Sequence, residues 1–161
     1  MGGRRIGTER IKMLLSPLIG TWRGEGAGEY PTIKSFWYTE ELTIEASGKP
    51  FLTYRQRTWS PAGDPMHTEV GFLRAPSPET IEFIIAQPTG QTELLEGEYT
   101  QTPTGFHLEL VGRIMNSGTA KQVDATQRRF DLAGDKLSYD FAMAAVGIPM
   151  THHLRATLTR V

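Results

Sequence analysis

The sequence predicts an all-β protein in which about ten antiparallel strands close into an up-and-down β-barrel, preceded by a short N-terminal helical segment. Short runs of alternating apolar and polar residues recur along the chain, and glycine and proline turns separate them at regular intervals. No helical segments lie between the runs, as a parallel sheet would require. The short connections suit hairpins, which favours a closed barrel over a sandwich, and a barrel of this size can hold a small ligand.

The helical segment is expected over residues 8–19. Ile11, Leu14, Leu15 and Leu18 are spaced to form one apolar face, and Pro17 should end any regular helix. In a chain that is otherwise β, such a short amphipathic piece is expected to pack across one open end of the barrel.

From residue 20 onward the sequence divides into ten β-type runs. The predicted strands are 20–30, 35–46, 51–59, 66–74, 80–87, 92–100, 105–114, 122–132, 136–145 and 150–161. The breaks between them contain turn residues, as in Ser47-Gly48-Lys49-Pro50 and Ala133-Gly134-Asp135. We therefore expect one barrel domain spanning residues 1–161.

Composition narrows the classes of function. Seventeen basic and eighteen acidic residues give a net charge of −1, which offers no electrostatic basis for binding nucleic acid or an anionic membrane. The chain has no cysteine, which excludes thiol catalysis and thiolate-ligated metals. No apolar run approaches the roughly 20 residues of a spanning helix, and the N-terminus lacks the apolar region of a secretory signal. A cytoplasmic protein is expected.

The C-terminal strand carries two adjacent histidines, His152 and His153, whose side chains must point to opposite faces. Simple alternation groups His152 with Leu154 and Ala156, and so sends His152 inward. If the interior binds a polar ligand, the other set could face inward and present His153. A bulge could also change the phase midway along the strand. The pattern alone leaves these alternatives open.

The first predicted strand opens with Gly20-Thr21-Trp22-Arg23-Gly24-Glu25-Gly26, followed by Gly28. Alternate glycines put bare backbone on one face, which allows sharp curvature or the close approach of another segment. A phosphate-binding loop is not indicated, because no strand precedes the glycines and no helix follows them.

This segment matches the G-x-W-x-G-x-G signature of the nitrobindins. Further stretches resemble the same family: Tyr30-Pro31-Thr32-Ile33, Pro65-Met66-His67 with Glu69 and Gly71, Ala86-Gln87-Pro88-Thr89-Gly90, and Met150-Thr151 followed by His153-Leu154. The resemblance runs from about residue 15 to the C-terminus. It implies a small barrel that binds haem b without covalent attachment, reacts as ferric haem with nitric oxide, and isomerises peroxynitrite to nitrate.

The resemblance also implies residue roles. His153 would be the axial iron ligand and the centre of catalysis, and a neutral imidazole suits iron. Met66, His67, Gln87 and Met143 would line the haem pocket, with His67 in its wall. Thr32 would contact a haem edge or propionate, and Lys121 would pair with a propionate. His152 would face away from the iron, and His107 matches no family motif and is expected on the solvated face.

Other functions remain open at this point. A lipophile carrier of the fatty-acid-binding type would use the same cavity without iron, and would turn Arg128, Arg129 or Arg155 toward a ligand carboxylate. An interaction module would fill its cavity with side chains. The expected partners are haem and small nitrogen-oxide ligands, with no nucleic acid and no membrane, and homodimer formation is an additional expectation.

Overall fold

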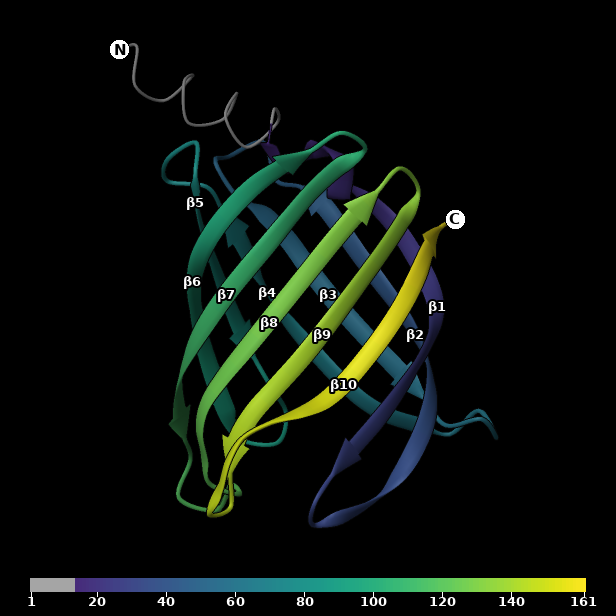
Figure 1. Ribbon diagram of the computed structural model, residues 1–161, viewed down its shortest axis with the longest axis vertical. Coiled ribbons are helices and arrows are strands. Elements are labelled where there is room, and N and C mark those ends of the chain that lie inside the picture. Colours follow the sequence, from purple (N-terminus) through teal and green to yellow (C-terminus); the bar gives the residue numbers. More distant parts are fainter. Residues whose placement is uncertain (1–13) are drawn as a thin grey trace.

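The computed structural model describes residues 14–161, which form a closed barrel of ten antiparallel strands (Figure 1). The strands are β1 (Gly20–Tyr30), β2 (Ile33–Ala46), β3 (Leu52–Trp59), β4 (Pro65–Arg74), β5 (Thr80–Ala86), β6 (Gln91–Thr102), β7 (Gly105–Asn116), β8 (Val123–Ala133), β9 (Lys136–Ala145) and β10 (Ile148–Arg160). Each strand pairs with the next in sequence, and β1 pairs with β10 to close the barrel. The predicted fold class is confirmed, and each predicted run overlaps one strand, with bounds that differ by at most two residues.

Within the described residues, the N-terminal helical expectation corresponds to Leu14, which is helical, and to a 3₁₀ turn, η1 (Ser16–Leu18). The part of that expectation covering residues 8–13 lies outside the described residues. Leu15 and Leu18 are buried at one end of the barrel, and the Trp22 indole donates a hydrogen bond of 2.9 Å to the Leu18 carbonyl. Arg160 also stacks on the Trp22 ring, with its guanidinium carbon 4.2 Å from the ring centroid. This end, called the η1 end below, is closed.

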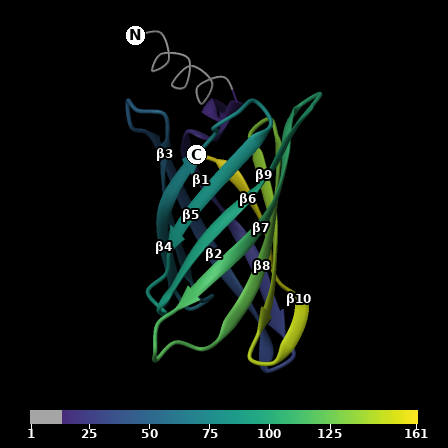
Figure 2. The same cartoon turned by 90° about the vertical axis from the view of Figure 1, so that its left-hand side faces the viewer.

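The turns that follow β1, β3, β5, β7 and β9 all lie at the opposite end, because each strand of an up-and-down barrel reverses direction. We call this the turn end; it is the lower end in Figures 1 and 2. Residues Pro31, Thr32, Gln87, Lys121 and Gly147 all belong to these connections.

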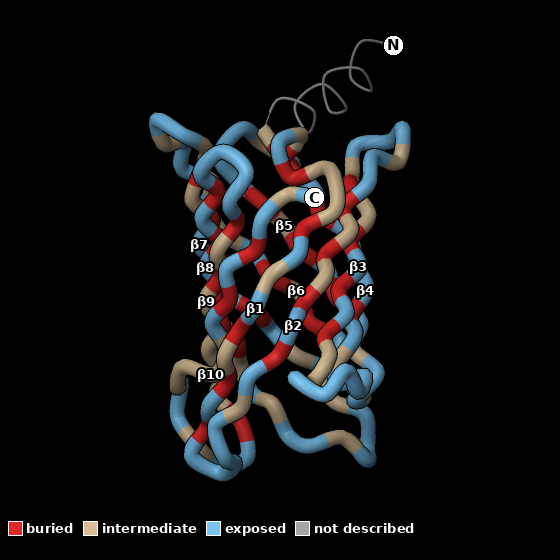
Figure 3. The backbone as a smooth tube through the Cα atoms, turned by 90° about the vertical axis from the view of Figure 1, so that its right-hand side faces the viewer, coloured by how far each residue is buried: buried red, intermediate tan, exposed pale blue. Residues whose placement is uncertain are grey.

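Burial alternates along the strands, as Figure 3 shows by the change between buried and exposed positions. The inward residues form an apolar core in the half of the barrel nearer the η1 end, with Trp22, Phe83, Phe106 and Leu158 among its largest fully buried members. The core retains only a void of about 10 Å³, enough for roughly one water. No helix among residues 14–161 is long and apolar enough to cross a membrane.

Candidate functional site

His153 lies on β10 near the turn end, where the strand contains a β-bulge. On β9, Ala142 pairs with His152 and the adjacent Phe141 pairs with Leu154, so His153 is an extra residue in β10. The bulge changes the phase of the strand: Leu154, Ala156 and Leu158 face inward beyond it, and His153 faces inward at it. Simple alternation therefore gave the wrong face for His152, because it assumed a regular strand.

Three aromatic rings surround the half-buried His153 imidazole. The centroids of Tyr30, Phe141 and Phe36 lie 5.4, 5.9 and 6.3 Å from that of the imidazole. Burial lowers the pKa of His153 below its usual range. The ring is therefore neutral at pH 7, which is the state in which imidazole binds a metal.

The orientation of the His153 ring is fixed by the backbone of Glu29. The Nδ1–H donates a hydrogen bond of 2.8 Å to the Glu29 carbonyl. That carbonyl is available because the β1–β2 register shifts between Gly28 and Tyr30, which leaves Glu29 outside the regular ladder. A proton on Nδ1 leaves the Nε2 lone pair free, so this geometry suits one axial metal bond through Nε2.

The glycines of β1 make room for this arrangement. A Cβ added at Gly28 would lie 2.2 Å from the Phe36 ring, and one at Gly26 would lie 2.3 Å from the Tyr38 ring. Phe36 can therefore lie against bare backbone on one side and His153 on the other. The close approach expected from the alternate glycines is confirmed.

His152 points to the outer face. Its Nδ1 lies 3.3 Å from a carboxylate oxygen of Glu29, and its Nε2 lies 3.3 Å from one of Asp140. Glu29 thus contacts both histidines, His153 through its carbonyl and His152 through its carboxylate. The adjacent histidines serve opposite faces of the wall.

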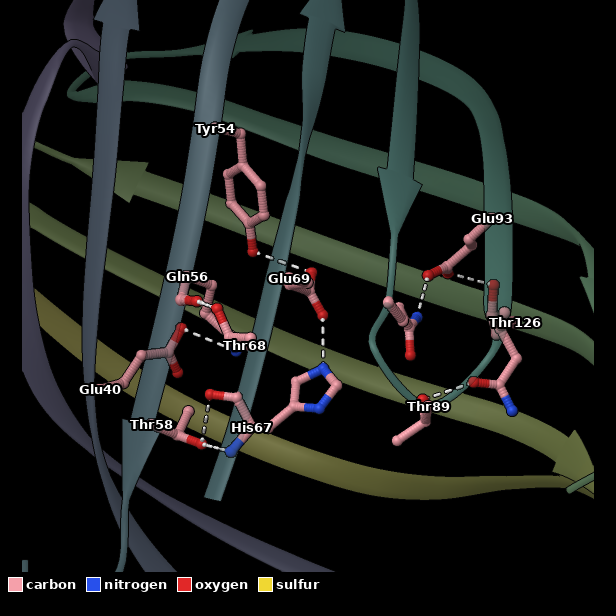
Figure 4. Close-up of polar contacts among 12 residues, drawn as sticks. Glu40, Tyr54, Gln56, Thr58, His67, Thr68, Glu69, Thr89, Glu93 and Thr126 are labelled. Carbon is pink, nitrogen blue, oxygen red and sulfur yellow. Dashed lines mark hydrogen bonds and ion pairs between the residues drawn. The ribbon is translucent and has the colours of Figure 1, made fainter. Parts of the chain in front are cut away.

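A buried polar network separates the apolar core from the turn end, and His67 on β4 forms one edge of it (Figure 4). The His67 Nε2 lies 3.2 Å from the Glu69 carboxylate, and the Thr58 hydroxyl accepts the His67 backbone N–H at 2.9 Å. The register of β3 and β4 also shifts beside Thr58, so the ladder is irregular here as it is at Glu29 and His153. Bulges of this kind re-aim side chains beside functional sites.

Arg128, on β8, is the centre of the network. Its guanidinium donates to Glu69 at 2.8 Å and to Glu93 at 2.7 Å, and all three side chains are buried. Burial raises the pKa of Glu69, but the Arg128 charge and the hydrogen bonds from His67 and Arg128 together outweigh burial and lower that pKa to about 2. The guanidinium carbon also lies 4.7 Å from the centroid of Phe141, one of the rings around His153.

A third buried carboxyl, Glu40, has no arginine within contact distance among the described residues. It accepts hydrogen bonds from the Tyr139 hydroxyl and, at 3.4 Å, from the Gln56 amide. The Tyr139 hydroxyl also lies 2.8 Å from that of Tyr38. Burial raises the pKa of Glu40 to about 7.

The predicted site residues fall into two groups. His153, His67, Gln87 and Met143 are half-buried at the turn end; Met143 lies on the inward phase of β9, and its carbonyl accepts the Tyr30 hydroxyl at 3.1 Å. Met66 is on the outward phase of β4 and 46% exposed, so the structure does not bring it among the inward residues. Thr32 and Lys121 are exposed in connections at the turn end.

No role in the haem site was predicted from the sequence for several residues that contact His153 or form the buried polar network. Arg128, Glu93 and Glu40 sit in the inward phase of their strands, each two residues before a buried apolar residue, which was the available signal. Glu29 acts through its backbone carbonyl, which residue type cannot indicate. Arg128 was expected to face inward only in a carrier, and its guanidinium is already held by two glutamates. Arg129 and Arg155 face outward and pair with Glu109 and Asp140.

At His153, the inward face at the turn end therefore offers a neutral imidazole with one free lone pair, surrounded by aromatic rings. Among the described residues no three His, Asp or Glu side chains are grouped to hold a metal ion. One imidazole suits an iron that arrives with a planar set of ligands already in place. The geometry defines a β-barrel whose site fits haem.

Comparison with known proteins identifies the family. The THAP4-like, heme-binding beta-barrel domain family matches residues 13–160. The chain belongs to this family, and the resemblance to nitrobindins is confirmed.

Individual relatives agree with this assignment. The chain is 52% identical over 148 residues to a peroxynitrite isomerase of Nocardia farcinica, an alignment covering 91% of this chain and 88% of that protein. It is 47% identical over 151 residues to peroxynitrite isomerase 1 of Mycobacterium tuberculosis, covering 91% and 92%.

Solved structures support the fold independently. The crystal structure of Rv2717c from M. tuberculosis superposes with a TM-score of 0.91 at 45% identity, covering 94% of this chain and 97% of that one. An S-type phycobiliprotein lyase from Guillardia theta shares the fold alone, at a TM-score of 0.61 and 11% identity.

Proposed function

We propose that this protein is a peroxynitrite isomerase that uses non-covalently bound ferric haem b, with His153 as the axial ligand. The observation that carries the proposal is the His153 ring, whose Nδ1–H is held by the Glu29 carbonyl and whose Nε2 is left free among aromatic side chains. The names of the relatives from N. farcinica and M. tuberculosis support the reaction. Nitric oxide is a second ligand in this proposal.

Bound haem would supply the iron chemistry that rearranges peroxynitrite to nitrate. The chain supplies the rest. Glu29 orients the His153 ring, and Tyr30, Phe36 and Phe141 shield it from water. His67 and Gln87 provide polar atoms in the cavity.

Four further residues complete the proposed haem contacts. Met143 packs against the ring, and Met66 contributes at the rim, in line with its exposure. Thr32 contacts a haem edge, and Lys121 pairs with a propionate as a point charge. Both lie in turn-end connections, where haem edges meet solvent.

The lipophile carrier is the weaker alternative. A carrier needs a free arginine for the ligand carboxylate and an open apolar interior. Arg128 is the inward arginine of the three considered, and Glu69 and Glu93 already occupy it. The apolar half of the barrel retains a void of only about 10 Å³. A cytoplasmic location and a homodimeric state remain part of the proposal.

Replacing His153 with alanine tests the proposal, with His152→Ala as the matched control one residue away on the opposite face. We expect His153→Ala to abolish the haem absorption band and peroxynitrite isomerisation followed by stopped-flow, because the axial bond is lost. His152→Ala should retain both. Unchanged haem affinity in His153→Ala would refute the ligand assignment.

A further inference from the structure

The buried network binds one side-chain nitrogen of each of two half-buried residues at the turn end, His67 and Gln87. The His67 Nε2 faces Glu69 Oε1 at 3.2 Å, and the Gln87 Nε2 faces Glu93 Oε1 at 3.0 Å. Arg128 joins the two glutamates from a third strand. The contacts therefore run from His67 through Glu69, Arg128 and Glu93 to Gln87, with the buried guanidinium at the middle.

Both glutamates meet donors at each oxygen. Glu69 Oε2 accepts from the Tyr54 hydroxyl at 3.1 Å and from Arg128 at 2.8 Å, while its Oε1 faces His67 and Arg128. Glu93 Oε2 accepts from the Thr126 hydroxyl at 2.5 Å and from Arg128 at 3.2 Å. Because a guanidinium can only donate, the carboxylates of Glu69 and Glu93 act as acceptors in all of these hydrogen bonds.

This arrangement decides which side-chain atoms of His67 and Gln87 remain free to bind a ligand. Because Glu69 accepts, the proton of a neutral His67 must be on Nε2, and its Nδ1 is left as an acceptor. Because Glu93 accepts, Gln87 must turn its amide nitrogen toward it, which uses one of its two N–H groups and points its carbonyl oxygen away from Glu93 as an acceptor. Figure 4 shows the second His67 ring nitrogen pointing away from Glu69, toward the end of β4 that lies at the turn end.

We propose that Arg128, Glu69 and Glu93 are positioning residues that make hydrogen-bond acceptors of the His67 ring nitrogen and the Gln87 oxygen that lie away from the network, and so favour ligands that carry a proton over bare anions. The preferred ligand class is water, a hydroxyl or the protonated form of a small oxyanion. The proposal rests on the proposed function in one respect only, that His67 and Gln87 face the ligand. The His67 tautomer does not depend on haem.

Glu69→Gln tests the tautomer in the haem-free protein. Two donors, Arg128 and Tyr54, converge on the Oε2 position and will hold the amide oxygen there. The amide nitrogen then faces His67, whose Nε2 must accept, so the ring proton moves to Nδ1. Nitrogen-15 NMR of the imidazoles should show the Nε2–H form in the natural protein and the Nδ1–H form in the variant.

The control is Glu109→Gln, which alters a glutamate 3.4 Å from His107 on the outer wall and should leave the His67 signals unchanged. An Nδ1–H tautomer in the natural protein would overturn the proposal without any variant. An unchanged tautomer in folded Glu69→Gln would also overturn it.

The second measurement is azide affinity of the ferric haem-loaded proteins at one fixed pH. Glu69→Gln gives His67 an Nδ1–H that can donate to the anion, so azide should bind about tenfold or more tightly. If the His67 tautomer inverts but the azide affinity is unchanged, the proposed preference for ligands that carry a proton would be overturned. Failure of His153 to bind haem would instead refute the proposed function, and the tautomer result would stand.

Discussion

The barrel wall carries the same three residue types, histidine, glutamate and arginine, in contact on each of its faces. On the inner face they are His67, Glu69 and Arg128, called the inner triad below. On the outer face they are His107, Glu109 and Arg129, the outer triad. In each, histidine and glutamate are two residues apart on one strand, and the arginines are neighbours on β8.

Water is what distinguishes the triads. The side chains of Arg128 and Glu69 are 9% and 4% exposed, whereas those of Arg129 and Glu109 are 58% and 56% exposed. Despite burial, the charge of Arg128 and the hydrogen bonds from His67 and Arg128 lower the pKa of Glu69 to about 2, and the low dielectric of the interior strengthens these contacts. The contrast teaches that residue types and spacing determine which side chains make contact, while burial determines how much that contact contributes to the free energy of unfolding.

The largest expected effect comes from breaking the inner triad. Arg128→Met leaves Glu69 and Glu93 buried without their counter-charge, which should cost about 3–5 kcal/mol of the free energy of unfolding. Arg129→Met removes a solvated pair and should change it by no more than about 0.5 kcal/mol. Urea unfolding at pH 7 measures both variants.

A combined variant sharpens this result. Glu69→Gln with Arg128→Met and Glu93→Gln removes the three charges together, so it should recover most of the stability lost in Arg128→Met. Equal losses in Arg128→Met and Arg129→Met would contradict the role given to burial.

Glu40 extends the comparison to a buried carboxyl that lacks an arginine. Its folded pKa of about 7 is above the ordinary value of about 4.5, so the folded state holds a proton that the unfolded state releases. Its contribution to stability is complete below about pH 4.5 and is lost as the pH rises through about 7. The difference across that range is up to about 3 kcal/mol.

Glu40→Gln removes the titration, so its stability should change less between pH 5 and pH 8 than that of the natural protein. Guanidinium chloride unfolding at the two pH values checks this. Parallel pH dependence in both proteins would show that Glu40 does not titrate in this range.

The fold could be predicted because each strand repeats the same signal. Alternation, short turns and the absence of intervening helices all indicate an antiparallel barrel, and the structure has ten such strands. In the N-terminal segment, the turn Ser16–Leu18 contains Pro17, the residue expected to end a regular helix, and residues 8–13 lie outside the described part of the chain.

The site depends on departures from alternation, which residue patterns do not reveal. The bulge at His153 reverses the face that simple periodicity assigns to His152. Family resemblance pointed His153 inward, in agreement with its place among Tyr30, Phe36 and Phe141. Arg128 and Glu93 were not predicted, since an inward charged residue is only stable beside partners from distant strands.

The smallest effect is expected at the outer triad. A hydrogen bond to Asp131, at 2.7 Å, raises the pKa of His107 above its usual range. The stabilisation is therefore complete below the ordinary histidine pKa of about 6.5 and is lost as the pH rises through the raised value. His107→Gln should lower the free energy of unfolding by no more than about 0.5 kcal/mol at pH 5.5, and by less at pH 8.5. Because solvent reaches both His107 and Asp131, 1 M salt should remove the difference in stability between the variant and the natural protein. A loss above 1 kcal/mol that survives salt would mean that the outer triad behaves like the buried one.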